Sequence, residues 1–181
     1  MSEAARQRMT ADEFIAWAME QPEGKHYELN AGEIVAMAPE RVAHARAKGR
    51  IFRRLAAAVE AAALPCEVFP DGMAVAVDAD AVYEPDVLLR CGAPLDPDAT
   101  KVTDPVVVVE VLSPSTRGVD AGEKLAGYFR LAPVRHYLIV RPGSPVVIHH
   151  ARNAVGEIIT RPVRETPLRL DPPGIAIDPF A

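Results

Sequence analysis

Glu110 is an acidic residue inside an apolar run that extends from Val106 to Leu112. An ionised carboxylate in such a strand is costly unless it is paired, bound to a metal or placed at the exposed end of the strand. Ser113 and Pro114 follow the run directly, so Glu110 lies near its carboxyl end. Because ligand sites collect at such strand ends in α/β sheets, Glu110 is a candidate functional residue.

Asp86 is the candidate partner of Glu110. It opens a short apolar segment, and the turn-rich stretch 92–98 separates this segment from the strand of Glu110. The midpoint between positions 86 and 110 is 98, so an antiparallel hairpin would place the two carboxylates opposite each other. Converging carboxylates suit a hard cation such as Mg²⁺. The residues alone leave another interpretation open, in which Asp86 is the polar residue after Pro85 and Glu110 has a salt-bridge partner.

The size and composition of the chain set limits on these interpretations. The 181 residues suit one domain spanning 1–181, and 49% of them are hydrophobic. A net charge of −5 argues against a protein that coats nucleic acid nonspecifically, whereas a metal-binding nuclease needs carboxylates. No apolar run approaches the ~20 residues of a membrane span, and no secretion signal is visible. We therefore expect a cytoplasmic protein with reduced Cys66 and Cys91 and no membrane contact.

Hydrophobic patterns predict the elements that would position these residues. Thr10 and Glu13 form a capping-box pattern at the start of a helix. The segment 106–112 is typical of a central strand covered on both faces. The proline-rich end after residue 161 is expected to be irregular but packed. The remaining expected elements are a hairpin with a three-residue turn over 26–37, a helix over 42–63, strands over 66–77 (broken at 71–72) and 86–89, a helix reaching 131, and strands over 136–140, 146–150 and 157–160.

The string Val-Glu-Val-Leu-Ser-Pro-Ser-Thr at 109–116, followed by Asp120, Lys124 and Tyr128, resembles a known family. It is similar to the bacterial restriction endonuclease branch (Uma-two type) of the PD-(D/E)xK nuclease superfamily. The resemblance covers nearly the whole chain and extends to the segments Pro85-Asp86, Tyr27-Glu28-Leu29 and Gly32-Glu33, to His44, and to the strand 136–140.

The resemblance implies a restriction-endonuclease-like core in an α/β (α+β) fold. This core has the order αβββαβ: a helix, an antiparallel meander of three strands, a crossing helix and a parallel fourth strand. The N-terminal helix and hairpin would flank its mixed sheet. The strand order inferred from the hydrophobic patterns agrees with this arrangement.

One position departs from the superfamily pattern, which has a lysine two residues after the glutamate. That position is Leu112, on the same strand face as Glu110. The candidate replacement is Lys124, which matches the branch's own pattern and shares a helical face with Asp120 and Tyr128. The alternative is that Lys124 forms a surface pair with Asp120, which would itself cap the helix.

The resemblance implies a metal-dependent endonuclease that hydrolyses the phosphodiester bonds of DNA. Asp86, Glu110 and the Val111 carbonyl would hold Mg²⁺ or Mn²⁺, and Lys124 would orient the attacking water or balance the transition-state charge. The surrounding residues expected to support these groups are Glu33, His44, Asp120 and Tyr128.

The sequence also allows two other functions and favours a particular oligomeric state. The missing lysine and the acidic net charge favour a catalytically silent nucleic-acid-binding or assembly module on the same fold. A third interpretation is a carboxylate-pair hydrolase acting on a small substrate such as a sugar. A homodimer is expected for the nuclease, because cleavage of duplex DNA needs two sites.

Overall fold

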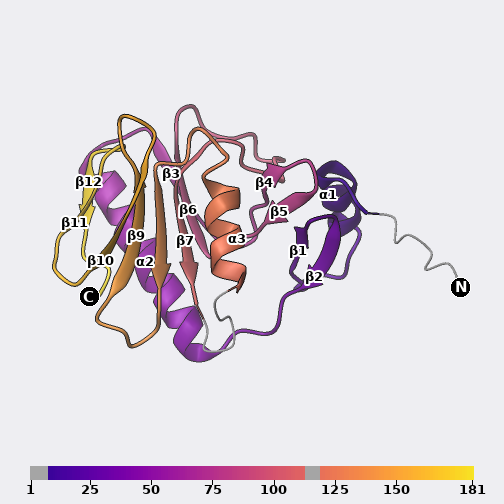
Figure 1. The fold of residues 1–181 in the computed structure, drawn as a ribbon, viewed down its shortest axis with the longest axis horizontal. Helices are drawn as coiled ribbons and strands as arrows, with labels where there is room; N and C mark the ends of the chain where they lie inside the picture. Colours follow the sequence, from indigo (N-terminus) through magenta and orange to yellow (C-terminus); the bar gives the residue numbers. More distant parts are fainter. Residues whose placement is uncertain (1–7, 113–118) are drawn as a thin grey trace, which may run out of the picture.

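A mixed sheet of six strands forms the centre of the described structure (Figure 1). The computed structural model describes residues 8–112 and 119–181, apart from the side chains of residues 119–121. Strands β7 and β8 are parallel, and every other neighbouring pair in this sheet is antiparallel. The spatial order is β10 (Ile158–Val163), β9 (Val147–Arg152), β8 (His136–Val140), β7 (Pro105–Val111), β6 (Val87–Cys91) and β3 (Cys66–Pro70).

Two helices cover opposite faces of this sheet, α2 (Val42–Ala61) and α3 (Val119–Tyr128) (Figure 1). Val107 and Val109 of β7 pack in the same hydrophobic cluster as α2, whereas Val108 packs in the cluster that contains Tyr128 of α3. Because side chains alternate along a strand, Glu110 follows Val108 onto the α3 face. The expected central strand with both faces covered is confirmed.

The predicted order αβββαβ is confirmed by α2, β3, β6, β7, α3 and β8. Two further strands are inserted between β3 and β6, and they belong to a second sheet that also contains the N-terminal hairpin. Among the described residues, the order in this sheet is β2 (Glu33–Ala36), β1 (Tyr27–Asn30), β5 (Ala81–Tyr83) and β4 (Val75–Asp78). The hydrophobic pattern of the sequence did not indicate β5 as a strand.

The N-terminal helix α1 (Ala11–Met19) and the hairpin that follows it agree with the predicted elements. Thr10 and Glu13 form the expected capping box. The turn of the hairpin is shorter than expected, because Asn30 pairs with Glu33 and only Ala31 and Gly32 lie between them. Both of these residues have positive φ, which is the conformation that tight two-residue hairpin turns need.

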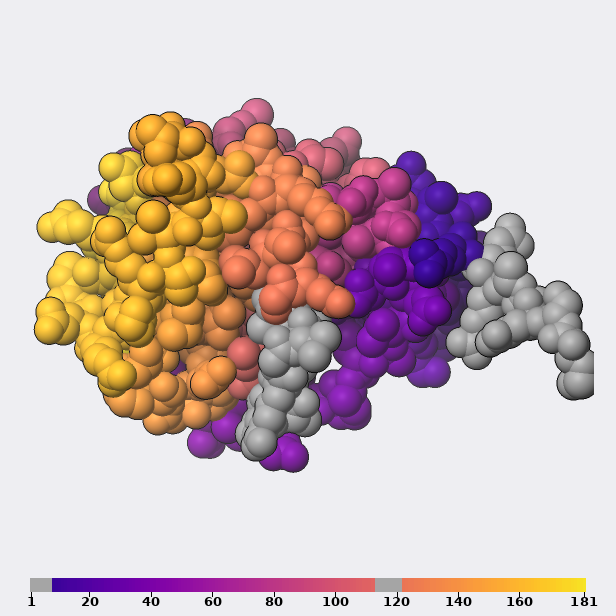
Figure 2. Space-filling view, viewed as in Figure 1, coloured from indigo at the N-terminus to yellow at the C-terminus, as the bar shows by residue number. Residues whose placement is uncertain are grey.

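The C-terminal segment differs from the expectation of an irregular end, because β11 (Leu168–Leu170) and β12 (Ile175–Ile177) pair as a hairpin. Its packing was predicted correctly, since the hairpin contributes buried side chains to the cluster beneath α2. The space-filling view shows this end of the chain at the opposite end of the molecule from the N-terminal elements (Figure 2). The hairpin therefore belongs to the core and not to the candidate site.

The two cysteines form a disulfide, so the expectation that they are reduced is wrong for this structure. Cys66 on β3 and Cys91 on β6 are direct partners in the antiparallel register of these strands. Beside them, the buried Arg90 forms two hydrogen bonds of 2.9 Å with the Asp104 carboxylate. These contacts connect the ends of β3, β6 and β7.

No helix in the described part of the chain combines the length and the apolar character that crossing a membrane would require.

Candidate active site

Asp86 and Glu110 come together through the register of β6 and β7. Val87 pairs with Val109 and Leu88 with Val108, so one further step along the ladder places Asp86 opposite Glu110. Both acidic residues are buried, each with 6% of its surface exposed. The charge of Asp86 is one of the causes that raise the pKa of Glu110, which indicates that the two carboxylates interact. The predicted antiparallel pairing of these two strands is confirmed.

Glu110 meets two hydrogen-bond donors from α3. Lys124 Nζ lies 3.2 Å from Glu110 Oε1, and the Tyr128 hydroxyl donates to the same oxygen at 2.7 Å. Burial raises the pKa of Glu110 to about 7, although the Lys124 ammonium and the Tyr128 hydrogen bond act in the opposite direction. Glu110 Oε2 has no hydrogen-bond partner among the described residues, so it is the oxygen that a cation would take.

Lys124 is buried, with 7% of its surface exposed, and its ammonium lies between two carboxylates. Besides Glu110, it contacts Glu28 Oε1 at 2.8 Å, and it lies 5.6 Å from the centre of the Tyr83 ring. The alternative of a surface position for Lys124 is therefore wrong. A buried ammonium is stabilised when it is paired with carboxylates and stacked on an aromatic face in this way.

Gly127 allows α3 to approach the second sheet closely enough for these contacts. A Cβ atom at this position would lie 2.6 Å from Tyr83 Cε2 and 3.2 Å from Val77 Cγ2. Since Gly127 is one turn from Lys124 and precedes Tyr128, a larger side chain here would displace both Glu110 partners. The glycine therefore acts through helix packing.

Glu28 is a buried member of the site that was not predicted from the sequence. It lies on β1, and its Oε1 also accepts a hydrogen bond from the Glu84 backbone N–H at 2.9 Å. The segment Tyr27-Glu28-Leu29 carried part of the family resemblance, but nothing in its spacing distinguished Glu28 from Glu33. Glu33 is exposed on the edge strand β2, and no described contact joins it to Asp86 or Glu110.

Asp86 is held by the backbone of β7 and by a histidine of α2. The Val111 N–H donates to Asp86 Oδ2 at 2.6 Å, and His44 Nε2 lies 3.5 Å from the same oxygen. A hydrogen bond to Asp86 is the largest cause of a raised pKa at His44, and burial opposes it. His44 therefore lies beside Asp86, as Tyr128 lies beside Glu110.

Several oxygen and nitrogen donors around Asp86 could hold a cation. Asp86, Glu40 and His44 offer ligand atoms that all lie within 4.8 Å of one another; this described group does not include Glu110. His44 Nδ1 is buried and has no hydrogen-bond partner among the described residues. A hydrogen bond with the Val111 backbone also contributes to the raised pKa of His44, so the backbone of Val111 lies close to the His44 ring. Such a donor set fits a divalent cation at Asp86.

Lys48 of α2 and Asp120 of α3 have different surroundings. Lys48 lines the same cavity as Asp86, but it forms ion pairs with Glu40 and with Asp71, and no described contact joins it to Glu110. The side chain of Asp120 lies outside the described residues, as do Ser113 and Pro114. Lys124 is thus the lysine that the fold brings to Glu110 within the described part of the chain.

Comparison with known proteins identifies the family. Residues 11–178 match the profile of the Uma2 family, which is described as "Putative restriction endonuclease". The chain belongs to the Uma2 family. The family resemblance predicted from the sequence is confirmed. This Uma2 chain departs from the wider superfamily pattern at Leu112, and it places Lys124 beside Glu110.

Two similar proteins accompany this family match. An uncharacterized protein of Synechocystis sp. is 29% identical over 152 residues, which covers 83% of the Uma2 chain and 77% of the relative. The crystal structure of a protein from Anabaena variabilis, described as a putative nuclease belonging to DUF820, superposes with a TM-score of 0.69 at 14% identity. The superposition covers 91% of this chain and 90% of the other. At this identity the match confirms the restriction-endonuclease-like fold.

Proposed function

We propose that this Uma2 protein is a metal-dependent endonuclease that hydrolyses phosphodiester bonds in DNA. The observation that carries the proposal is the burial of Asp86 and Glu110 opposite each other on adjacent strands, with the Lys124 ammonium against Glu110. Two neighbouring buried carboxylates oppose folding through desolvation and mutual repulsion, which the Lys124 ammonium and a bound divalent cation together would offset. The family description and the fold are consistent with this assignment.

Asp86, Glu110 and the Val111 carbonyl are the proposed ligands of Mg²⁺ or Mn²⁺. Such an ion polarises the scissile phosphate and lowers the pKa of a water molecule bound to it. Glu110 would use Oε2, because Oε1 accepts from Lys124 and Tyr128. The Val111 N–H and His44 hold Asp86 in the orientation that this requires.

Lys124 is the proposed replacement for the lysine absent at Leu112. Its ammonium is close enough to Glu110 to orient a water molecule there or to balance negative charge on the phosphate in the transition state. Glu28 fixes the other side of the ammonium, and Tyr128 fixes the oxygen that the ammonium contacts. These groups are positioned before substrate binds, which reduces the reorganisation that the reaction needs.

A catalytically silent nucleic-acid-binding or assembly module is the second candidate. It is favoured by Leu112, since no ammonium lies on Glu110's own strand face, and by the net charge of −5. Such a module would keep the fold and the ion pairs around Lys124 without turning over a substrate.

A cleavage assay on supercoiled plasmid and on single-stranded DNA separates these candidates. We expect cleavage with Mg²⁺ or Mn²⁺, none in EDTA, and a loss of at least about a hundredfold in Asp86→Asn, which removes one ligand charge. Glu60→Gln is the matched control, because it removes an exposed carboxylate near the end of α2 that is remote from His44. DNA binding without cleavage in wild type would establish the silent module, and activity that persists in EDTA would contradict the metal-dependent mechanism.

A further inference from the structure

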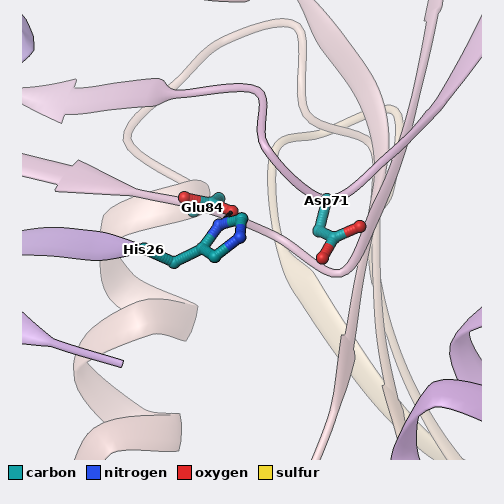
Figure 3. A group of neighbouring side chains, drawn as sticks. All are labelled: His26, Asp71 and Glu84. Carbon is teal, nitrogen blue, oxygen red and sulfur yellow. Dashed lines mark hydrogen bonds and ion pairs between the residues drawn. The ribbon is translucent and has the colours of Figure 1, made fainter. Parts of the chain in front are cut away.

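His26, Asp71 and Glu84 form a second group of donors outside the proposed catalytic residues (Figure 3). They come from three different segments: His26 precedes β1, Asp71 follows β3 and Glu84 follows β5. One ligand atom from each lies within 4.8 Å of the other two. In Figure 3 the Asp71 carboxylate lies across from the His26 ring and Glu84, which are themselves in contact. The fold therefore brings together three donors that are distant in sequence.

The spacing and the donor types suit a transition-metal cation. Metal–nitrogen and metal–oxygen bonds of about 2.0–2.2 Å place donors to one ion up to about 4.4 Å apart. The His26 group is within a few tenths of an ångström of this limit. Imidazole with carboxylates favours ions such as Zn²⁺ or Mn²⁺, whereas Mg²⁺ prefers oxygen donors alone.

The present partners of these side chains leave oxygen atoms for an ion. His26 Nδ1 lies 2.5 Å from Glu84 Oε1, and Lys48 holds Asp71 Oδ2 at 2.6 Å. Glu84 Oε2 and Asp71 Oδ1 have no hydrogen-bond partner among the described residues. Glu84 is largely buried, and burial raises the pKa of its carboxyl, with the charges of Asp71 and Glu28 acting in the same direction. A bound cation would offset this concentration of negative charge.

The group lines a cavity of about 540 Å³ that also reaches Asp86. The charged residues of its lining include four carboxylates but only two lysines, and one of these, Lys48, is already paired with Glu40 and Asp71. A cavity with this charge would repel a phosphate backbone at the entrance to the proposed catalytic centre. A divalent ion at its wall would offset this excess of negative charge.

We propose that His26, Asp71 and Glu84 bind a divalent transition-metal cation, separate from the ion proposed at Asp86 and Glu110 and facing the same cavity. The ion binding rests on this donor group alone. Its consequence, an attractive surface for the phosphates of the substrate, rests on the proposed nuclease function. The bound cation would offset the negative charge of the cavity, which by itself would repel the phosphates of the substrate.

Manganese binding to the full chain tests the site without measuring activity. Electron paramagnetic resonance of Mn²⁺ counts the bound ions, and its pulsed form detects a nitrogen ligand. We expect two Mn²⁺ per wild-type chain and one in Asp86→Asn, and the ion that remains in Asp86→Asn should show nitrogen coupling. Adding His26→Ala to Asp86→Asn should abolish that ion and its coupling.

Single variants complete the design. His26→Ala and Glu84→Gln should each retain one ion, the one at Asp86, and their thermal unfolding verifies that they fold. Glu33→Gln, an exposed carboxylate of the neighbouring hairpin, is the control and should bind two. If His26→Ala and Glu84→Gln both fold and bind as many ions as wild type, the proposal is overturned. If Asp86→Asn binds as many Mn²⁺ ions as wild type while His26→Ala binds one fewer, the result contradicts only the metal site proposed at Asp86 and Glu110.

Discussion

Lys124 Nζ lies 3.2 Å from Glu110 Oε1, although the two residues belong to a helix and a strand that are separated in sequence by residues 112–118. The contact supplies an ammonium to the side of β7 where the superfamily pattern would place one at Leu112. Since α3 crosses the sheet on the Glu110 face, a lysine of its second turn reaches the carboxylate that the strand lysine would accompany in the pattern. Stabilisation of a phosphoryl transition state depends on where the positive charge lies, and not on whether a helix or a strand carries it.

We expect Lys124→Ala to lower kcat by about a hundredfold or more with little change in DNA affinity, because the ammonium acts on charge that develops during the reaction. Lys48→Ala is the comparison, since Lys48 pairs with Glu40 and Asp71 in the cavity and should chiefly affect salt-sensitive binding. Steady-state kinetics and binding titrations at two salt concentrations measure both effects. Intact turnover in Lys124→Ala, with activity abolished in Lys48→Ala, would transfer the role to α2.

We expect Glu28→Gln to lower the pKa of Glu110 from about 7, because the charge of Glu28 is one of the causes that raise it. Carbon-13 NMR of the glutamate carboxyl groups follows this titration directly in protein without metal. The matched control is Glu33→Gln in the same hairpin, where the side chain is exposed and should leave Glu110 unaffected. A Glu110 titration that is identical in Glu28→Gln and wild type would show that Glu28 does not influence the site.

The long elements of the fold could be predicted because each carries a repeated pattern. The capping box at Thr10, the apolar stripe of α2 and the continuous apolar run of β7 fix these elements locally. The short strand β5 could not be recognised in the same way. Its three residues pair with β1 and β4, and residue Val82 meets Leu29 more than fifty positions away, so its partners depend on the tertiary fold.

The candidate site shows the same division between local and long-range information. Asp86 and Glu110 could be paired from the sequence because the hairpin register depends only on their positions. Glu28 could not be chosen over Glu33, because its burial results from the packing of β1 between two other strands and against α3. The disulfide was missed for a related reason, since Cys66 and Cys91 become neighbours only through the β3–β6 register.

The homodimer expected for cleavage of duplex DNA stays a prediction, and the edge strand β2 is the surface we assign to it. Its residues are all exposed, they include Ile34 and Val35, and the strand ends the second sheet without a proline or lysine that would block pairing. We expect Val35→Lys to be monomeric in sedimentation equilibrium at micromolar concentration. Val155→Lys, at an exposed turn, should sediment like the wild type. A monomeric wild type, with and without DNA, would contradict the assignment.

The stability of the fold should depend on pH through His149 on β9, which β8 separates from the strand of Glu110. Its ring contacts His136 Nδ1 at 2.9 Å on the central sheet, and burial, followed by the charges of His136, His150 and Arg161, lowers the pKa of His149 to about 4 from an ordinary value of 6.5. The unfolded chain therefore binds a proton below pH 6.5 that the folded protein binds only near pH 4. The free energy of unfolding that depends on a neutral His149 is fully present above pH 6.5 and is lost progressively as the pH falls toward 4.

We expect this loss to be on the order of 2 kcal/mol, allowing for the partial contact of His149 with solvent. Urea unfolding of wild type and His149→Gln at a series of pH values between 7 and 4 measures it as the difference between the two proteins, because Glu110, whose pKa is raised to about 7, contributes with the opposite sign in both. His149→Gln keeps a hydrogen-bonding side chain that does not titrate, so its free energy of unfolding should be lower at pH 7 but should change less over the same range. If wild type and His149→Gln lost stability in parallel between pH 6.5 and 4, another group would have to be responsible. Hydrogen bonds from Arg90 lower the pKa of the Asp104 carboxyl. The contribution of Asp104 to stability is therefore lost at a lower pH than that of His149, so the two losses can be distinguished.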